Sequence, residues 1–188
     1  MVPSLLYDGA PMDMDNNFTF RRADESDHER VHGWFAMPHV SEYWGDAGTN
    51  TQDFDDSMNG VSNLFNYWIG EQGDEPFCLM ITTDAASGEP EHLMPHLARA
   101  GDTWTLDVLI GPLEFMGRGL AVPMLQAFLN HIRQQNPSIN AVLIDPEANN
   151  PRAIHVYEKA GFRKVSEFTP TEGEHKGLLH ILMALHLA

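Results

Sequence analysis

The sequence has one cysteine, Cys78, and few basic residues, with 11 lysines and arginines against 27 aspartates and glutamates. One cysteine excludes an internal disulfide and favours a reducing, cytoplasmic setting. Cys78 stands in the apolar run at 77–81, which predicts a buried strand thiol and not a nucleophile. The formal net charge of −16 argues against nucleic acids and anionic membranes as partners, because both would repel the chain.

The chain also lacks long apolar runs, internal repeats and low-complexity segments. No run approaches the length that spans a bilayer, and the first fifteen residues lack the basic start and apolar stretch of a secretory signal. The length of 188 residues fits one domain, so we expect an irregular lead-in at 1–17 and a single domain at 18–188, as a monomer or homodimer. The acidic balance suits a small cationic substrate, with solubility or an acidic host proteome as the alternative explanation.

Hydrophobic periodicity predicts an α/β fold with a mixed sheet and helices on both of its faces. We expect strands at 18–22, 65–71, 76–83, 103–110, 141–145, 162–169 and 177–186, and helices at 24–37, 121–135 and 151–160. Pro38 is expected to end the first helix, and a hairpin turn is expected at 72–75.

Two polar stretches are harder to interpret. Residues 50–63 predict a mobile segment or a short helix over the acceptor side, and their aspartates lack the spacing of an EF-hand. Residues 85–102 predict a variable loop that faces the substrate, where acidic residues could bind an amine. The polar side chains of this loop that could contact a substrate are Glu89, Glu91, His92 and His96. The two histidines have no obvious third ligand, so we expect no metal.

The turn at 116–121, with the sequence Met-Gly-Arg-Gly-Leu-Ala, joins the strand at 103–110 to the helix that follows. Glycines leave backbone N–H groups uncovered, and a helix N-terminus adds partial positive charge. The turn therefore favours a bound phosphate. It is not a P-loop, because no Lys-Ser or Lys-Thr follows the second glycine, and it lacks the three-glycine spacing of a Rossmann turn.

About thirty residues later, the segment at 149–162 reads Asn-Asn-Pro-Arg-Ala-Ile-His-Val-Tyr-Glu-Lys-Ala-Gly-Phe. Together with the turn at 116–121, it resembles the GCN5-related N-acetyltransferases (GNAT), which carry these two motifs in this order. Within that family the sequence is most similar to the aminoglycoside 6'-N-acetyltransferases, since Asp107 and Asp145-Pro146 stand at matching strand positions. Siderophore-assembly acyltransferases share much of the pattern. The resemblance implies a seven-stranded, mostly antiparallel GNAT sheet whose central strands splay apart.

The resemblance also implies the site residues. Acetyl-CoA would be the co-substrate, with its pyrophosphate on Met116, Gly117, Arg118, Gly119, Leu120 and Ala121, and with Asn150, Ala153 and Tyr157 near its thiol end. Met116 departs from the family, which has Gln or Arg there. Backbone N–H groups at Val108, Leu109 and Ile110 suit the thioester oxygen. Tyr157 would be the general acid, and Asp107 and Asp145 would orient an ammonium and accept its proton, directly or through water.

The segment at 39–45 has the composition of an acceptor pocket, because Glu42 lies beside the aromatic residues Tyr43 and Trp44. A hydrophobic plug on the core is the alternative, and we expect His39 to be buried and hydrogen-bonded. For Tyr157 the alternative is a core aromatic on its helix, and for the two aspartates the alternative is a structural role in capping loops. The sequence therefore predicts acetyl transfer to a primary amine of a small polycation such as an aminoglycoside. A siderophore-pathway acyltransferase acting on a lysine-type amine and a non-catalytic CoA-binding module remain as alternatives.

Overall fold

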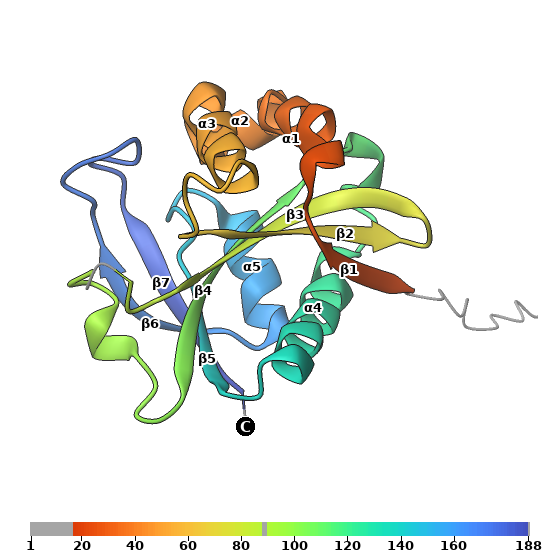
Figure 1. Ribbon diagram of the computed structural model, residues 1–188. Coiled ribbons are helices and arrows are strands. Elements are labelled where there is room, and N and C mark those ends of the chain that lie inside the picture. Colours follow the sequence, from red (N-terminus) through yellow and green to blue (C-terminus); the bar gives the residue numbers. More distant parts are fainter. Residues whose placement is uncertain (1–16, 88–89, 188) are drawn as a thin grey trace, which may run out of the picture.

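The computed structural model describes residues 17–87 and 90–187 (Figure 1). The lead-in expected at 1–17 lies outside the described residues except for Asn17, and Glu89 lies outside them as well. The described chain folds around one seven-stranded sheet in the order β1-β2-β3-β4-β5-β7-β6. All neighbouring strands are antiparallel except β4 and β5, which are parallel. The strands are β1 (Phe18–Arg22), β2 (Asn66–Gln72), β3 (Glu75–Asp84), β4 (Asp102–Ile110), β5 (Ile139–Ile144), β6 (Arg163–Phe168) and β7 (His180–His186).

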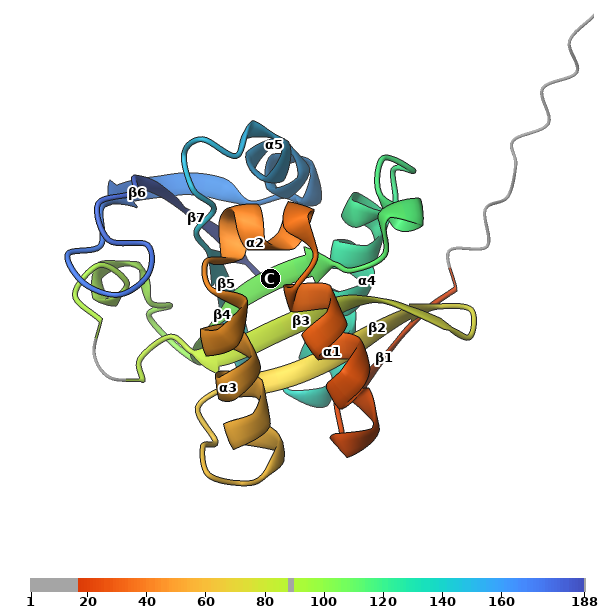
Figure 2. The same cartoon turned by 90° about the horizontal axis from the view of Figure 1, so that it is seen from above.

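Helices cover both faces of this sheet, as the sequence predicts (Figures 1 and 2). Successive side chains of a strand point to opposite faces of the sheet, so Trp68 and Met80 lie on one face and Ile69 and Leu79 on the other. The first face packs against α4 (Ala121–Gln135) and α5 (Pro151–Ala160), and the second packs against α1 (His28–Phe35), α2 (Pro38–Trp44) and α3 (Ala47–Met58). No helix in the described part of the chain is long and apolar enough to cross a membrane.

The parallel pairing of β4 with β5 stops halfway along β4. The last paired residues are Thr105 on β4 and Leu143 on β5, so β4 continues through Asp107 to Ile110 without a β5 partner. On its other edge β4 stays paired with β3 as far as Ile110. The two central strands therefore splay, which confirms the expected feature and opens the middle of the sheet.

The N-terminal helical region differs from the sequence prediction. The predicted helix at 24–37 is a 3-10 turn at Glu25–Asp27, capped by Asp24, followed by α1. Pro38 was expected to end a helix, but it occupies the first turn of α2, where a missing N–H costs nothing. The acidic stretch expected as a mobile segment or short helix contains most of α3, which starts earlier and is capped by Asp46.

An ion pair with a buried carboxylate ties β1 to this helical region. The side chain of Asp27 is fully buried, and the Arg21 guanidinium donates to both of its carboxylate oxygens, at 2.6 and 2.8 Å. Arg30 donates to the same carboxylate. Burial alone would raise the pKa of Asp27, but the hydrogen bonds from Arg21 and from the Asp24 backbone, with the arginine charges, hold it below its ordinary value.

Candidate active site

A cavity of about 890 Å³ opens where β4 and β5 splay. It lies between the end of β4, the residues after β5, helices α2 and α3, and the first turns of α4 and α5. This size is in the range of cavities that hold small-molecule ligands. The predicted site residues that line it are Glu42, Tyr43, Trp44, Asp107, Val108, Leu109, Ile110, Met116, Ala121, Asp145, Asn150, Ala153 and Tyr157.

Four residues of the predicted pyrophosphate turn are not in the lining. Gly117, Arg118 and Gly119 are exposed on the surface, and Leu120 is buried in the core. Both glycines have positive φ angles, +72° and +75°, which favour glycine strongly over other residues. Their backbone N–H groups, and those of the next three residues up to Val122, have no hydrogen-bond acceptor among the described residues. The turn thus presents free donors at the N-terminus of α4, which is the arrangement that a phosphate requires.

Two of the three backbone groups predicted at the end of β4 point into the splay. The Gly111 N–H donates to Phe77 O of the β3 side at 2.9 Å. Because hydrogen-bonded pairs alternate along an antiparallel ladder, the Leu109 N–H faces β3 as well. The N–H groups of Val108 and Ile110 therefore face the gap. The set of donors predicted for a thioester oxygen narrows to these two.

Asp107 is exposed to solvent within the cavity, where the surrounding protein replaces part of its contact with bulk water. This desolvation and the nearby negative charge of Asp145 raise the pKa of Asp107 to about 7, while His180 acts in the opposite direction. A carboxyl group with such a pKa can bind and release a proton near neutrality.

Tyr157 lies on α5 with its ring buried against Phe162 and its side chain in the cavity lining. Burial, followed by the charges of Asp107 and Asp145, raises its pKa. Tyr157 is only 9% exposed, yet its hydroxyl forms no hydrogen bond with another described residue. Tyr157 is therefore both a core aromatic and a protonated phenol that is free to interact with a ligand.

The wall formed by α2 and α3 carries the predicted acceptor segment. Trp44 packs on Phe35 with their ring centroids 5.8 Å apart, so it belongs to the core as well as to the cavity. Asn50 and Asp53 of α3 join this wall, in agreement with the expectation that the segment at 50–63 lies over the acceptor side, although the sequence did not single them out as site residues. His39 is half-buried, and its Nε2 lies 3.0 Å from Ile110 O, which confirms the hydrogen bond expected from the sequence.

A cluster of three further side chains was missed from the sequence. Glu147 and His180 are buried, and His175 Nδ1 lies 3.3 Å from Glu147 Oε1. The His180 Nδ1 donates to the backbone carbonyl of Asp145 at 2.8 Å and lies 3.4 Å from the Asp145 carboxylate. The interaction with the carboxylate is the main cause of the raised pKa of His180, and the backbone contact adds to it. All three line the cavity. They meet because β7 pairs with β5, a contact between residues far apart in the sequence.

The described part of the loop at 85–102 does not line the cavity, contrary to the expectation of a substrate-facing loop. His92 stacks on Phe168 of β6 with ring centroids 4.0 Å apart. His96 lines a separate hollow of about 500 Å³, together with His186 of β7. The loop follows β3 and returns to β4 at the paired end of β4, away from the gap.

Comparison with known proteins shows the family of this chain. Residues 23–170 match the family model described as acetyltransferase (GNAT) domain. The aminoglycoside N(6')-acetyltransferase type 1 of Klebsiella pneumoniae is 24% identical over 170 residues, which cover 84% of this chain and 80% of that protein. The solved aminoglycoside N(6')-acetyltransferase of Legionella pneumophila is 34% identical, with a TM-score of 0.73 and coverage of 90% and 91%.

A further solved structure shares the fold. It is an aminoglycoside acetyltransferase in complex with coenzyme A and kanamycin, 22% identical, with a TM-score of 0.72 and coverage of 90% of this chain and 94% of the other. These findings confirm the resemblance, the fold and the enzyme class predicted from the sequence. The chain is a member of the GNAT acetyltransferase family, similar to its aminoglycoside 6'-N-acetyltransferases.

Proposed function

We propose that this protein transfers the acetyl group of acetyl-CoA to the 6'-amine of an aminoglycoside, by direct attack within a ternary complex. The observation that carries the proposal is the acidic cavity at the splay of a GNAT sheet. Its lining holds five carboxylates, Glu42, Asp53, Asp107, Asp145 and Glu147, and Arg152 is the one arginine or lysine among the described lining residues. Such a cavity concentrates a polycation and repels anions.

The residues present fit acetyl-CoA. The free N–H groups at Gly117, Gly119 and the start of α4 suit the pyrophosphate, and Arg118 adds a positive charge on the same turn. The cofactor supplies an activated thioester. The N–H groups of Val108 and Ile110 would polarise its carbonyl from the unpaired edge of β4.

Two residues of this chain would move the protons. Asp107 takes a proton from the acceptor's ammonium, because its pKa of about 7 leaves a useful fraction ionised at neutral pH. Tyr157 donates a proton to the departing thiolate, and the second proton that the nitrogen loses as the amide forms returns to the Tyr157 oxygen, directly or through water. The negative charge of Asp107 is one cause of the raised pKa of Tyr157, so protonation of Asp107 lowers that pKa. Uptake of the amine proton would thus make Tyr157 a stronger acid when the thiolate forms.

The test is a comparison of two aminoglycosides that differ only at the 6' position, one with an amine and one with a hydroxyl. Release of the CoA thiol should be rapid with the 6'-amine and fall to background with the 6'-hydroxyl compound. A lysine-like monoamine should have a lower kcat/KM than the 6'-amine compound, and raising the salt concentration should narrow this difference because it screens the cavity's field.

Asp107→Asn keeps the shape of the side chain and removes its charge and basicity. It should lower kcat/KM for the aminoglycoside while leaving acetyl-CoA affinity unchanged, with Glu114→Gln on the exposed turn before α4 as a matched control that affects neither. Equal rates with both members of the 6' pair would refute the proposed position of acetylation. A preference for the monoamine would favour a siderophore-type amine acceptor instead.

A further inference from the structure

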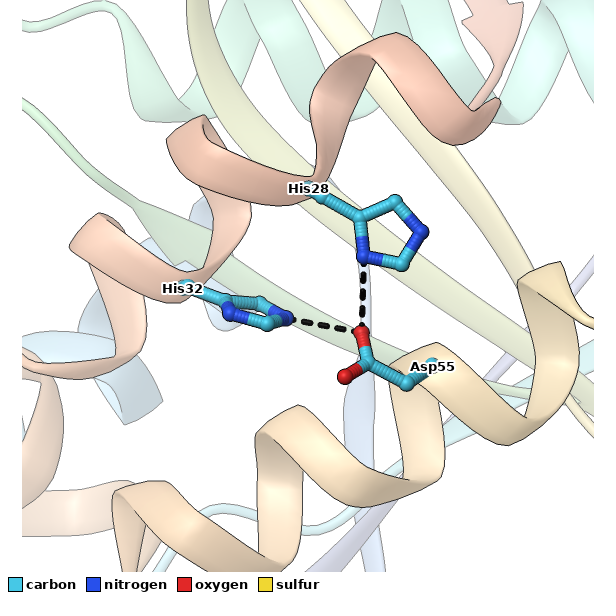
Figure 3. A group of neighbouring side chains, drawn as sticks. All are labelled: His28, His32 and Asp55. Carbon is cyan, nitrogen blue, oxygen red and sulfur yellow. Dashed lines mark hydrogen bonds and ion pairs between the residues drawn. The ribbon is translucent and has the colours of Figure 1, made fainter.

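Two histidines and one aspartate meet where α1 crosses α3, outside the cavity described above (Figure 3). His28 and His32 lie four residues apart on one face of α1, and Asp55 reaches them from α3. His28 Nδ1 lies 2.9 Å and His32 Nε2 lies 2.7 Å from the same carboxylate oxygen, Asp55 Oδ1. One nitrogen of each imidazole ring therefore points to the same carboxylate oxygen of Asp55.

Packing holds the two rings in this orientation. Both stand edge-on to Phe54, the neighbour of Asp55 on α3, with ring centroids 5.4 Å away for His28 and 6.3 Å for His32. Phe54 is fully buried, so the floor beneath the two rings is rigid and apolar. The cluster is thus preorganised by the core and not by the carboxylate alone.

We propose that His28, His32 and Asp55 form a binding site for a divalent transition-metal ion, Zn²⁺ by preference. Imidazole nitrogens and carboxylate oxygens are the ligands that Zn²⁺ uses together, and two histidines at i and i+4 on a helix are a known zinc-binding spacing. Three protein ligands leave a fourth position for water. Without a metal, His28 Nδ1 and His32 Nε2 each carry a proton and donate it to Asp55. A bound cation takes the place of these two protons, and each nitrogen then coordinates the cation through its lone pair.

The distances are close to those that a metal requires. With metal–ligand bonds of about 2.0–2.2 Å, tetrahedral ligand atoms lie about 3.4 Å apart. The nitrogen–oxygen separations of 2.9 and 2.7 Å must therefore open by about 0.5 and 0.7 Å to reach this value. The three side chains are 29%, 38% and 31% exposed, which allows this movement and gives an ion a path of entry.

The surrounding charges favour a cation. The chain is strongly acidic, and Asp56 follows Asp55 on α3. The nearby arginines, Arg21 and Arg30, are already paired with the buried Asp27. A bound ion would also fix α3 against α1, and α3 carries Asn50 and Asp53 of the cavity wall.

Titration calorimetry of the metal-free protein with Zn²⁺ tests the proposal. We expect one site per chain, and at a hundredfold excess of Zn²⁺ over Kd we expect Tm to rise by about 5–10 °C. His32→Gln is the informative variant, because its amide can still donate to Asp55 and preserve the helix contact, yet it is a poor zinc ligand. It should weaken Zn²⁺ binding at least about tenfold, as should Asp55→Asn.

Two controls separate this site from other histidines. His155→Gln removes an exposed histidine on α5, and His175→Gln removes a member of the Glu147 cluster, which also groups two histidines with a carboxylate. Neither should change binding at the proposed site. Absence of saturable Zn²⁺ binding by the native protein would overturn the proposal. So would a folded His32→Gln variant with native affinity, or a loss of the Zn²⁺ site only in His175→Gln.

Discussion

The pH dependence of acetyl transfer should report the unusual environment of Asp107. If Asp107 must be ionised to accept the proton of the amine, kcat/KM rises with pH through its pKa, which is raised to about 7. For one titrating base, kcat/KM at pH 6 should be about one-tenth of its plateau and at pH 8 about nine-tenths. A carboxylate with an ordinary pKa near 4 would give a flat profile above about pH 5.

The neighbours of Asp107 allow the midpoint to be moved in both directions. Asp145→Asn removes a negative charge that raises the pKa of Asp107, so the midpoint should move to lower pH. His180→Gln removes a group that lowers this pKa, so the midpoint should move to higher pH. Asp107→Asn should abolish this low-pH limb and reduce kcat/KM by roughly 10²–10⁴-fold.

The assay is thiol release with saturating acetyl-CoA and one aminoglycoside, from pH 5 to 9, with the native protein and the three variants. The acceptor's own amines titrate in every variant alike, so differences between variants isolate the enzyme. Urea unfolding at the same pH values verifies that each variant is folded. A native profile that is flat from pH 5 to 8, or midpoints that neither neighbour variant moves, would show that Asp107 is not the base.

Three further outcomes are expected. Tyr157→Phe should lower kcat by roughly 10²-fold with unchanged calorimetric affinity for CoA; full turnover in a folded variant would mean that another group or water protonates the thiolate. Gly119→Val should weaken CoA binding, because it strains a backbone with a φ angle of +75° and covers its donors, whereas Gly73→Val, at a φ angle of +64° in the hairpin between β2 and β3, should not; equal CoA affinities would refute this placement. Asp27→Asn should reduce the free energy of unfolding in urea by about 2 kcal/mol at pH 7, because it weakens the hydrogen bonds to two arginines that remain partly hydrated. Because the pKa of Asp27 is lowered by folding, its contribution is present above pH 4 and lost as pH falls further, so native and variant stabilities should converge in acid.

Local patterns predicted much of the fold. The strand, turn and helix around 116–121 follow from glycine and apolar spacing, and α5 begins at Pro151 after the Asn150 cap and ends at Gly161, whose φ angle is +112°. The helices around the acceptor wall were harder to predict. Proline permits a helix to start as well as to end, and α3 buries only Phe54 fully among its residues, so its apolar periodicity is weak.

The rest of the site depends on contacts between distant parts of the chain. Glu147 and His180 come together through an isolated bridge between the loop after β5 and the start of β7. The pKa of Asp107 depends on Asp145 and His180, neither of which is near it in the sequence. His32 and Asp55 are 23 residues apart and belong to separate helices. Pairwise proximity of this kind leaves no periodic signal in a sequence.

The burial of Cys78 has a practical consequence for every thiol measurement on this enzyme. Cys78 is fully buried, its burial raises its pKa, and a Cβ built on Gly70 would lie 2.3 Å from its sulfur, so the space around it is closed. The native chain should therefore be invisible to a thiol-reactive dye, and the colour that develops during turnover should come from CoA alone. When the chain unfolds, one equivalent of thiol per molecule should appear. The same dye thus counts product while the protein is intact and reports denatured protein when it is not.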